Sequence, residues 1–365
     1  MFDDLTYMLN MGDFSDWERK EMETNKIDFK KKLAKILKES REMAKPKKCY
    51  YCGKDITSCC NSHSVPAFCL RNIAEAGEVA TTNILINFPL LDNEKGVKQA
   101  GTFQIICDKC DNEIFADYEN PDNYENKPSN KMLAQIALKN NLNLISKRLL
   151  ENAMYNNMYE GFNLLESIKN GKQYVNDLDL KEYIGGFKKA KNSIEKNWND
   201  EYYLCYYEKL KYTVPIAFQA SISMVVGFEG EVINDVYNSS PTYKIKPIHI
   251  CIFPLKNSSV IMMFVENGDK RYRKFYKKFN SLTLEDRLQT LTYIIFAYSE
   301  DVFFSKKISE EAKACSELVC ASQQAQDVFS QIPICNAIDM AKENFALERR
   351  VNISNLLSEK YKLDI

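Results

Sequence analysis

The pattern of apolar and polar positions predicts a long helix near the start of the chain, within residues 19–48. Its apolar residues recur at roughly helical spacing: Ile27, Leu33, Ile36 and Leu37. Pro46 ends this helix, because proline cannot continue one. The segment carries twelve Lys or Arg residues against five Asp or Glu residues. Two interpretations stay open, a solvated basic helix face and a basic helix that contacts phosphate groups.

A second helical pattern begins at residue 131, after a polar, proline-containing linker over residues 120–130. Its apolar positions recur at helical spacing: Leu133, Ile136, Ala137, Leu142, Ile145 and Leu149. This spacing is typical of a long amphipathic helix. A further polar helix is predicted over residues 180–197.

The middle of the chain is rich in β-branched and aromatic residues, which favour strands. Three strands are predicted, within residues 212–228, 246–254 and 258–266, and PLKNSS is expected to close a hairpin between the last two. The following GDKRYRKFYKKF reads as a helix that packs its aromatic residues on the sheet. His249 lies inside the second strand, where we expect it to be a hydrogen-bonded sheet residue.

The segment between residues 47 and 120 mixes short elements. A helix is expected over residues 65–75, opened by Pro66, because proline is tolerated in a first turn. Strands are expected over residues 79–91 and 102–106, and the sequence DNEIFADYE should be helical.

Composition and charge narrow the function classes. The 365 residues carry a net charge of −1, so any nucleic-acid binding has to come from a local patch. We expect no signal peptide and no membrane span, because no apolar run reaches about 18 residues. The phosphate-binding, dinucleotide-binding and hydrolase glycine motifs are missing from the sequence. ATP, NAD and hydrolase chemistry of those kinds is therefore not expected.

Twelve cysteines without a signal peptide indicate reduced thiols and a cytoplasmic protein. Seven of them lie between Cys49 and Cys110, and four of these form two Cys-x-x-Cys pairs: Cys49, Cys52, Cys107 and Cys110. Two such pairs supply the four thiolates that a tetrahedral Zn²⁺ ion requires. Two coincidental pairs of buried or redox cysteines are the alternative.

The string CYYC…SHSVP…CDKCDNEIF resembles the HNH nucleases, in which zinc knuckles frame a hairpin-and-helix unit. The resemblance implies a treble-clef zinc module with His63 as the general base. It also implies that Asn112 orients that base or its loop, and that Asp117 or Glu119 holds a catalytic Mg²⁺ or Mn²⁺ ion. Ser62 stands where these nucleases usually carry a metal ligand, and the last histidine of the family name is absent.

A resemblance over most of the chain exists to a group of bacterial proteins of unassigned activity. The matching pieces are SHSVPAFCLRNIAEAGEV (62–79), FQIICDKCDNEIFADYE (103–119) and the later segments IHICIFPLKNSSVIMMF and IIFAYSEDVFFS. It implies an HNH-like zinc module fused to a domain of helices and β-sheet.

Three roles for His63 stay open. It can act as the base of a nuclease, or as a structural residue beside Ser62 and Ser64, which would cap the helix near Pro66. It can also be a zinc ligand, alone or together with nearby cysteines: Cys59, Cys60 and Cys69.

The sequence therefore predicts an α+β protein in three parts. A basic helical arm (1–46) precedes an HNH-like zinc-binding module (47–125) and an α+β C-terminal domain (126–365) with a central antiparallel sheet. The first functional hypothesis is a metal-dependent DNA endonuclease in defence against phage. The second is an inactive zinc module whose C-terminal domain binds nucleic acid, protein or a small ligand, with Glu300 in a pocket of that domain.

Overall fold

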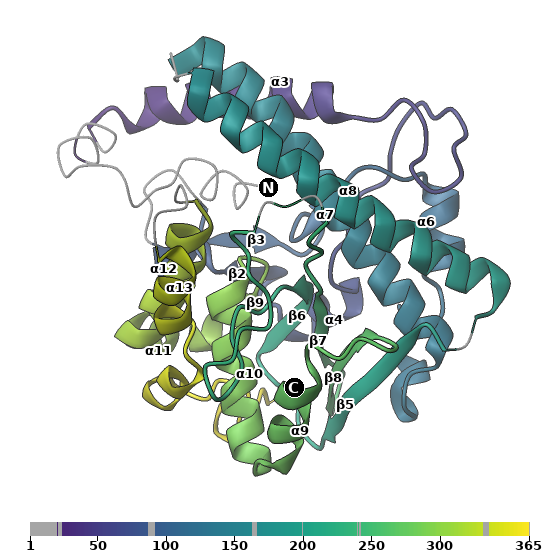
Figure 1. Cartoon of the computed structure of the whole chain (residues 1–365), viewed down its shortest axis with the longest axis vertical. Coiled ribbons are helices and arrows are strands. Elements are labelled where there is room, and N and C mark those ends of the chain that lie inside the picture. The colour runs from purple at the N-terminus through teal and green to yellow at the C-terminus, as the bar shows by residue number, and fades with distance from the viewer. Residues whose placement is uncertain are drawn as a thin grey trace.

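A seven-stranded sheet forms the centre of the chain in the computed structural model, which describes residues 20, 24–86, 92–162, 166–198, 200–238, 240, 242–330 and 336–364. The strand order is β3-β2-β9-β6-β7-β8-β5, and every neighbouring pair is antiparallel (Figure 1). The strands are β2 (Glu78–Thr81), β3 (Glu94–Gly96), β5 (Tyr202–Leu210), β6 (Ile216–Ile222), β7 (Ile248–Pro254), β8 (Ser259–Glu266) and β9 (Phe303–Phe304). The predicted combination of helices with a central antiparallel sheet is confirmed.

The predicted hairpin is the middle of this sheet. All residues of β7 are buried, and its register pairs Pro254 with Ser259 next to the turn. Strands that are buried on both faces are expected to be continuously apolar, which is how the β7 and β8 sequences read. The PLKNSS turn and both flanking strands are therefore where the sequence placed them.

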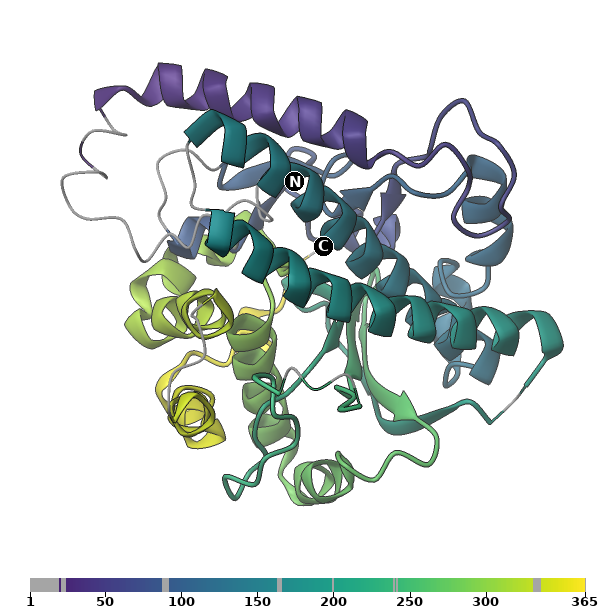
Figure 2. The same cartoon turned by 45° about the horizontal axis from the view of Figure 1, so that its top comes forward.

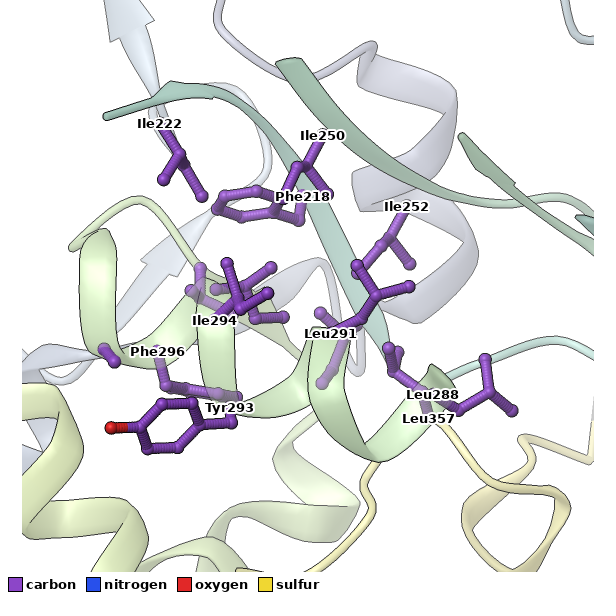
Figure 3. Close-up of a cluster of buried hydrophobic side chains, with 14 of the residues drawn as sticks. Phe218, Ile222, Ile250, Ile252, Leu288, Leu291, Tyr293, Ile294, Phe296 and Leu357 are labelled. Carbon is purple, nitrogen blue, oxygen red and sulfur yellow. The ribbon is translucent and has the colours of Figure 1, made fainter. Parts of the chain in front are cut away.

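The two faces of the sheet support two different packing layers. On one face, Ile250 and Ile252 of β7 lie against α10 (Leu284–Tyr298), and Figure 3 shows them pointing toward Leu291 and Ile294. On the other face, Phe253 contacts the segment that precedes the long helices, with its ring 5.5 Å from that of Tyr124. Alternation along β7 thus fills both cores from one strand.

Two long helices and one shorter helix cover the second face. They are α3 (Lys26–Ala44), α7 (Asn130–Phe162) and α8 (Glu166–Lys196). Figure 2 shows α7 and α8 lying across the sheet, with α3 along their outer side. The basic helix ends at Ala44, just before Pro46, as predicted, and it buries Ile36 and Leu37.

The remaining helices complete the layer on the α10 side and the rims of the sheet. They are α4 (Ala67–Ile73), α5 (Asn83–Ile86), α6 (Asp108–Ile114), α9 (Arg273–Ser281), α11 (Ser309–Ala314), α12 (Ser316–Ser330) and α13 (Ala337–Asn344), with 3-10 turns at Pro121–Glu125, Lys306–Ile308, Leu347–Asn352 and Glu359–Tyr361. The aromatic stripe predicted for α9 is buried at Tyr272, Phe275 and Phe279. The basic residues Lys274, Lys277 and Lys278 of the same helix face outward.

The strand predicted over residues 79–91 ends earlier than expected, because residues 83–86 are helical. Strand β2 ends at Thr81, and α5 begins two residues later. The side chain of Asn83 donates to the carbonyl of Asp92 at 2.9 Å. This bond links the two ends of the connection between β2 and β3. Residues 87–91 lie outside the described residues.

The helix predicted over DNEIFADYE is shorter than expected, because α6 ends at Ile114. The side chain of Gln135 on α7 donates to the carbonyl of Ile114 at 2.6 Å and accepts from the amide of Tyr118 at 3.2 Å. A side chain from another helix thus bonds the Ile114 carbonyl and the Tyr118 amide, which would have bonded each other if the helix had continued.

Strand β5 was not predicted. The register of β5 against β8 shifts between Leu204 and Tyr206, so its apolar residues do not alternate regularly along the sequence. The two-residue strand β9 is too short for any periodic pattern, yet it joins β2 to β6.

Residues of the predicted zinc module and of the predicted C-terminal domain share one sheet and one apolar core. Strands β2 and β3 extend the sheet formed by the later strands, and Phe68 of α4 packs on Phe253 of β7 with ring centroids 6.3 Å apart. The treble-clef assignment and the division into three parts stay predictions. In the described part of the chain, the helices lack the combined length and apolar character that a membrane span requires.

Candidate metal centre

The first cysteine pair lies in a tight loop closed by an antiparallel bridge between Lys48 and Asp55. The amide of Gly53 donates to the carbonyl of Cys49 at 2.8 Å. Gly53 has a φ of 71°, a conformation that glycine adopts at little cost. The loop therefore turns sharply enough to bring Cys49 and Cys52 to one side.

The second cysteine pair lies at the start of α6. Cys107 is the N-cap residue of this helix, and Cys110 is in its first turn. The short strand β4 (Thr102–Phe103) precedes the pair and is antiparallel to β1 (Ser62–His63). The predicted passage from strand through cysteine pair into helix is present.

The four sulfur atoms lie within 4.8 Å of one another. Thiolates bound to Zn²⁺ at about 2.3 Å would be about 3.8 Å apart at the corners of a tetrahedron. The amide of Cys107 donates to the Cys49 sulfur at 3.4 Å, as backbone amides do in zinc knuckles. The four residues can therefore hold a metal ion such as zinc. Cys49 and Cys110 are buried and Cys52 is exposed, which places this site at the edge of the core.

The surroundings of Cys110 disfavour its free thiolate form. Burial raises the pKa of the Cys110 thiol, and hydrogen bonding with Cys107 and Cys52 raises it further. A divalent ion would remove this penalty because it binds the deprotonated form.

The centre is anchored to helix α8. The ring of Tyr50 meets that of Phe187 edge-on at 5.3 Å, and Lys191 lies 4.4 Å from the centre of the Tyr51 ring. The loop between the first two cysteines thus packs against α8, so its position depends on the tertiary structure.

His63 lies outside the cysteine cluster. Among the described residues, the four cysteines are the single group of three or more His, Cys, Asp or Glu side chains placed to share a metal ion. This group includes neither His63 nor the nearby thiols at Cys59, Cys60 and Cys69. The Nε2 atom of His63 is 3.0 Å from the carbonyl of Val97, which orients the ring on β1.

The capping role predicted for Ser62 and Ser64 is wrong. Helix α4 has Pro66 as its N-cap residue, and no side chain caps it. Ser62 instead donates to Asp111 at 2.6 Å, because pairing with β4 turns its side chain inward toward α6.

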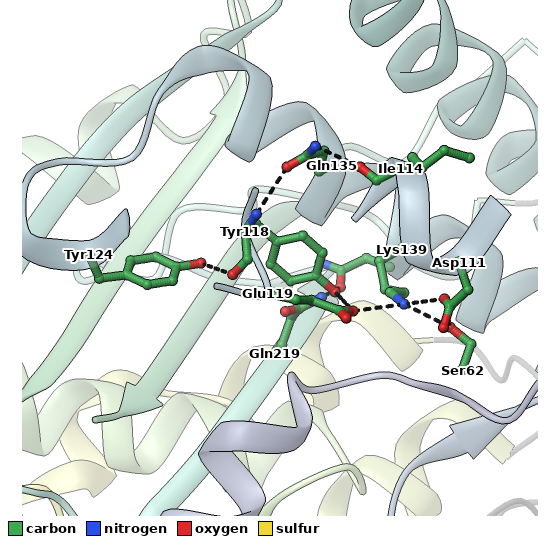
Figure 4. Close-up of polar contacts among 10 residues, drawn as sticks. Ser62, Asp111, Ile114, Tyr118, Glu119, Tyr124, Gln135, Lys139 and Gln219 are labelled. Atoms are coloured by element: carbon green, nitrogen blue, oxygen red, sulfur yellow. Dashed lines mark hydrogen bonds and ion pairs between the residues drawn. The ribbon is translucent and has the colours of Figure 1, made fainter. Parts of the chain in front are cut away.

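A buried lysine, Lys139 of α7, occupies the space between β1 and α6 (Figure 4). Its Nζ atom is 2.7 Å from the Ser62 hydroxyl, 2.8 Å from Asp111 and 3.0 Å from Glu119. It also lies over the Phe115 ring at 3.8 Å. This ammonium group therefore has two carboxylates, one hydroxyl and one aromatic face as partners.

The other residues predicted to be catalytic are spread over different surroundings. Asp117 pairs with Lys131 at 2.7 Å and accepts from Gln135 at 2.8 Å, and Lys131 holds the pKa of this carboxyl below its usual value. Asn112 is exposed on α6. Among the contacts between described residues, Lys139 meets only one of the four predicted catalytic residues, Glu119.

Sequence reasoning missed Ser62, Asp111 and Lys139 as one polar cluster. One signal was available, since Lys139 falls three residues after Ile136 and three before Leu142, within the apolar stripe of the helix. A lysine at a core position needs an anionic partner, although the sequence does not say which one.

Comparisons of this chain with protein-family models, with curated proteins and with solved structures find no match.

Proposed function

We propose that the four-cysteine cluster binds a structural Zn²⁺ ion that holds residues 47–125 in their fold. The observation that supports this proposal is the position of the four sulfur atoms. They lie within 4.8 Å of one another, although 54 residues separate the two cysteine pairs in the sequence. One cysteine pair lies in a tight loop and the other in the first turn of α6, so a metal ion would fix these two short segments to each other. The β1–β4 pair followed by α6 supports the HNH-like, treble-clef assignment.

We infer that this module is a scaffold and not a nuclease. A metal-dependent nuclease needs carboxylates that are open to a divalent cation. Here Asp111 and Glu119 both contact the ammonium of Lys139, and Asp117 contacts Lys131. A second cation beside Lys139 would meet a buried positive charge at short range, which is unfavourable at low dielectric.

An HNH-type DNA endonuclease, with a role in defence against phage, is the second candidate. One observation favours it: His63 lies on β1 with its Nε2 atom bonded to the Val97 carbonyl. Because a carbonyl oxygen only accepts, Nε2 is the donor in this contact, and Nδ1 is the ring nitrogen that would act on water in a nuclease.

The zinc proposal is tested by metal analysis of purified protein. We expect one zinc ion per chain in the wild type and a loss of zinc in Cys110→Ser. The matched control is Cys320→Ser, which changes an exposed cysteine of α12 and should keep its zinc. A zinc-replete, folded Cys110→Ser protein would contradict the four-cysteine site.

The choice between scaffold and nuclease is tested on plasmid DNA with Mg²⁺ or Mn²⁺. We expect no cleavage by the wild type or by His63→Ala at equal zinc content. Cleavage by the wild type that His63→Ala abolishes, with zinc retained, would replace the scaffold proposal by the endonuclease.

A further inference from the structure

Two adjoining cavities lie between the long helices and the end of the sheet where β6 finishes and β7 begins. Each has a volume of about 250 Å³, and they share Leu144 of α7, Asp179 and Tyr183 of α8, and Ser221 of β6. Glu300, which the sequence placed in a pocket of this part of the chain, lines the second cavity. Neither cavity is lined by a cysteine of the metal centre.

His249 presents a hydrogen-bond donor in the wall of the first cavity. Asn140 accepts from Gln219 at 2.9 Å through its oxygen, so its amide group donates to Nδ1 of His249 at 3.0 Å. The proton of the neutral ring is then on Nε2. Burial lowers the pKa of His249 to about 4, which keeps the ring neutral. No hydrogen bond to Nε2 comes from any described residue.

Three hydroxyl groups line the same cavity. Tyr202, which is 6% exposed, is held by an edge-on contact with Phe264 at 5.6 Å. Ser221 is paired with His249 across β6 and β7, and Ser223 follows at the end of β6. Within the described part of the chain, none of these hydroxyls has a hydrogen-bond partner. Ser221 and Ser223 are half-buried at the cavity wall, so their hydroxyls, like that of Tyr202, are open to the cavity and can bond a ligand.

The charged groups of the walls largely neutralise each other. Lys246 lies 2.8 Å from Glu266, Arg148 lies 3.1 Å from Asp179, and Lys147 lies 2.9 Å from Asp301. The second cavity still has four carboxylates against two cationic side chains, so its walls disfavour an anionic ligand. The carboxylates of both cavities offer lone pairs to hydroxyl donors, as Glu182 does to the amide of Ile245 at 3.2 Å.

We propose that these cavities bind an uncharged, hydroxyl-bearing ring compound of the sugar or nucleoside type. Such a molecule both donates and accepts hydrogen bonds, which matches neutral donors on the β-sheet side and carboxylate acceptors on the helix side. Ring hydroxyls would reach the carboxylates, and ring or carbonyl oxygens would accept from His249, Tyr202 and Ser221. This inference is independent of the zinc site and of the choice between scaffold and nuclease.

The test is saturation-transfer NMR on the full chain with two groups of probes. One group contains adenosine, guanosine, cytidine and uridine, and the other contains ribose, glucose and galactose. We expect transfer to at least one probe at millimolar concentration. Transfer confined to the nucleosides would identify a nucleoside site, and transfer confined to the free sugars would identify a sugar site.

Two conservative variants locate the binding. Tyr202→Phe and Ser221→Ala each remove one hydroxyl that has no partner among the described residues, so the stability should stay unchanged while the affinity falls about tenfold. Tyr207→Phe is the matched control on the same strand, because its hydroxyl donates to the Asn126 carbonyl away from the cavities. The proposal is overturned if no probe shows transfer, or if both cavity variants bind as the wild type does.

Discussion

Lys139 shows how a single buried charge organises its surroundings. Its side chain is fully buried, and its partners Asp111 and Glu119 are 18% and 33% exposed. Burying an ammonium group is costly, and this cost is offset only while its anionic partners stay in place. The residue therefore links α7 to α6 and β1 by charge as well as by packing.

Replacing Lys139 should be strongly destabilising. Lys139→Met keeps the length of the side chain but leaves Asp111 and Glu119 without their cation. We expect a loss of about 3–5 kcal/mol in the free energy of unfolding, measured by urea denaturation. Lys131→Met is the control, because that exposed pair with Asp117 should contribute less than about 1 kcal/mol. Equal losses in the two variants would refute the special role of Lys139.

At the scale of elements, the end of α6 is set by a residue of another helix. Gln135 of α7 bonds both the last carbonyl of α6, at Ile114, and the amide of Tyr118. It also donates to Asp117. This side chain explains why the helical pattern of the sequence extends beyond the helix that forms.

Removing the side-chain amide of Gln135 should loosen the end of α6. Gln135→Leu preserves bulk but leaves two backbone groups unsatisfied, so we expect a loss of about 1–3 kcal/mol and faster amide hydrogen exchange at Tyr118. Lys109→Ala on the same helix removes only an exposed contact with Glu113 and should change little. Unchanged exchange at Tyr118 in Gln135→Leu would contradict this assignment.

At the scale of the whole molecule, the metal centre and the sheet share one core. Tyr124 packs on Phe253 of β7, and Tyr50 packs on Phe187 of α8. Contacts of this kind make the parts of a chain unfold together, because losing one side exposes apolar surface on the other.

Zinc removal should therefore lower the stability of the entire chain. With a strong chelator we expect one thermal transition at a reduced temperature. Calorimetry and circular dichroism would measure this transition. Two separate transitions, with the sheet melting at its original temperature, would show that residues 47–125 unfold alone. The same result would support the three-part division predicted from the sequence.

The sequence by itself determined the elements whose signals are local. The β7–β8 hairpin, helices α3 and α7 and the cysteine pairs follow from alternation, helical spacing and short motifs, which depend on neighbouring residues. Of α8, only the second half was predicted, because the helix begins at Glu166 and not near residue 180. The aromatic face of α9 was predictable for the same reason. The candidate metal ligands were found because Cys-x-x-Cys spacing reports the geometry of a single turn.

Only the tertiary structure decided which distant residues meet. The contact of Lys139 with Ser62 and Asp111 spans 77 and 28 residues, and the pairing of β2 with β9 joins segments more than 200 residues apart. The cavity at His249 likewise combines two helices and four strands. Such contacts depend on how whole elements pack, and no periodic pattern in one segment records which segment will cover it.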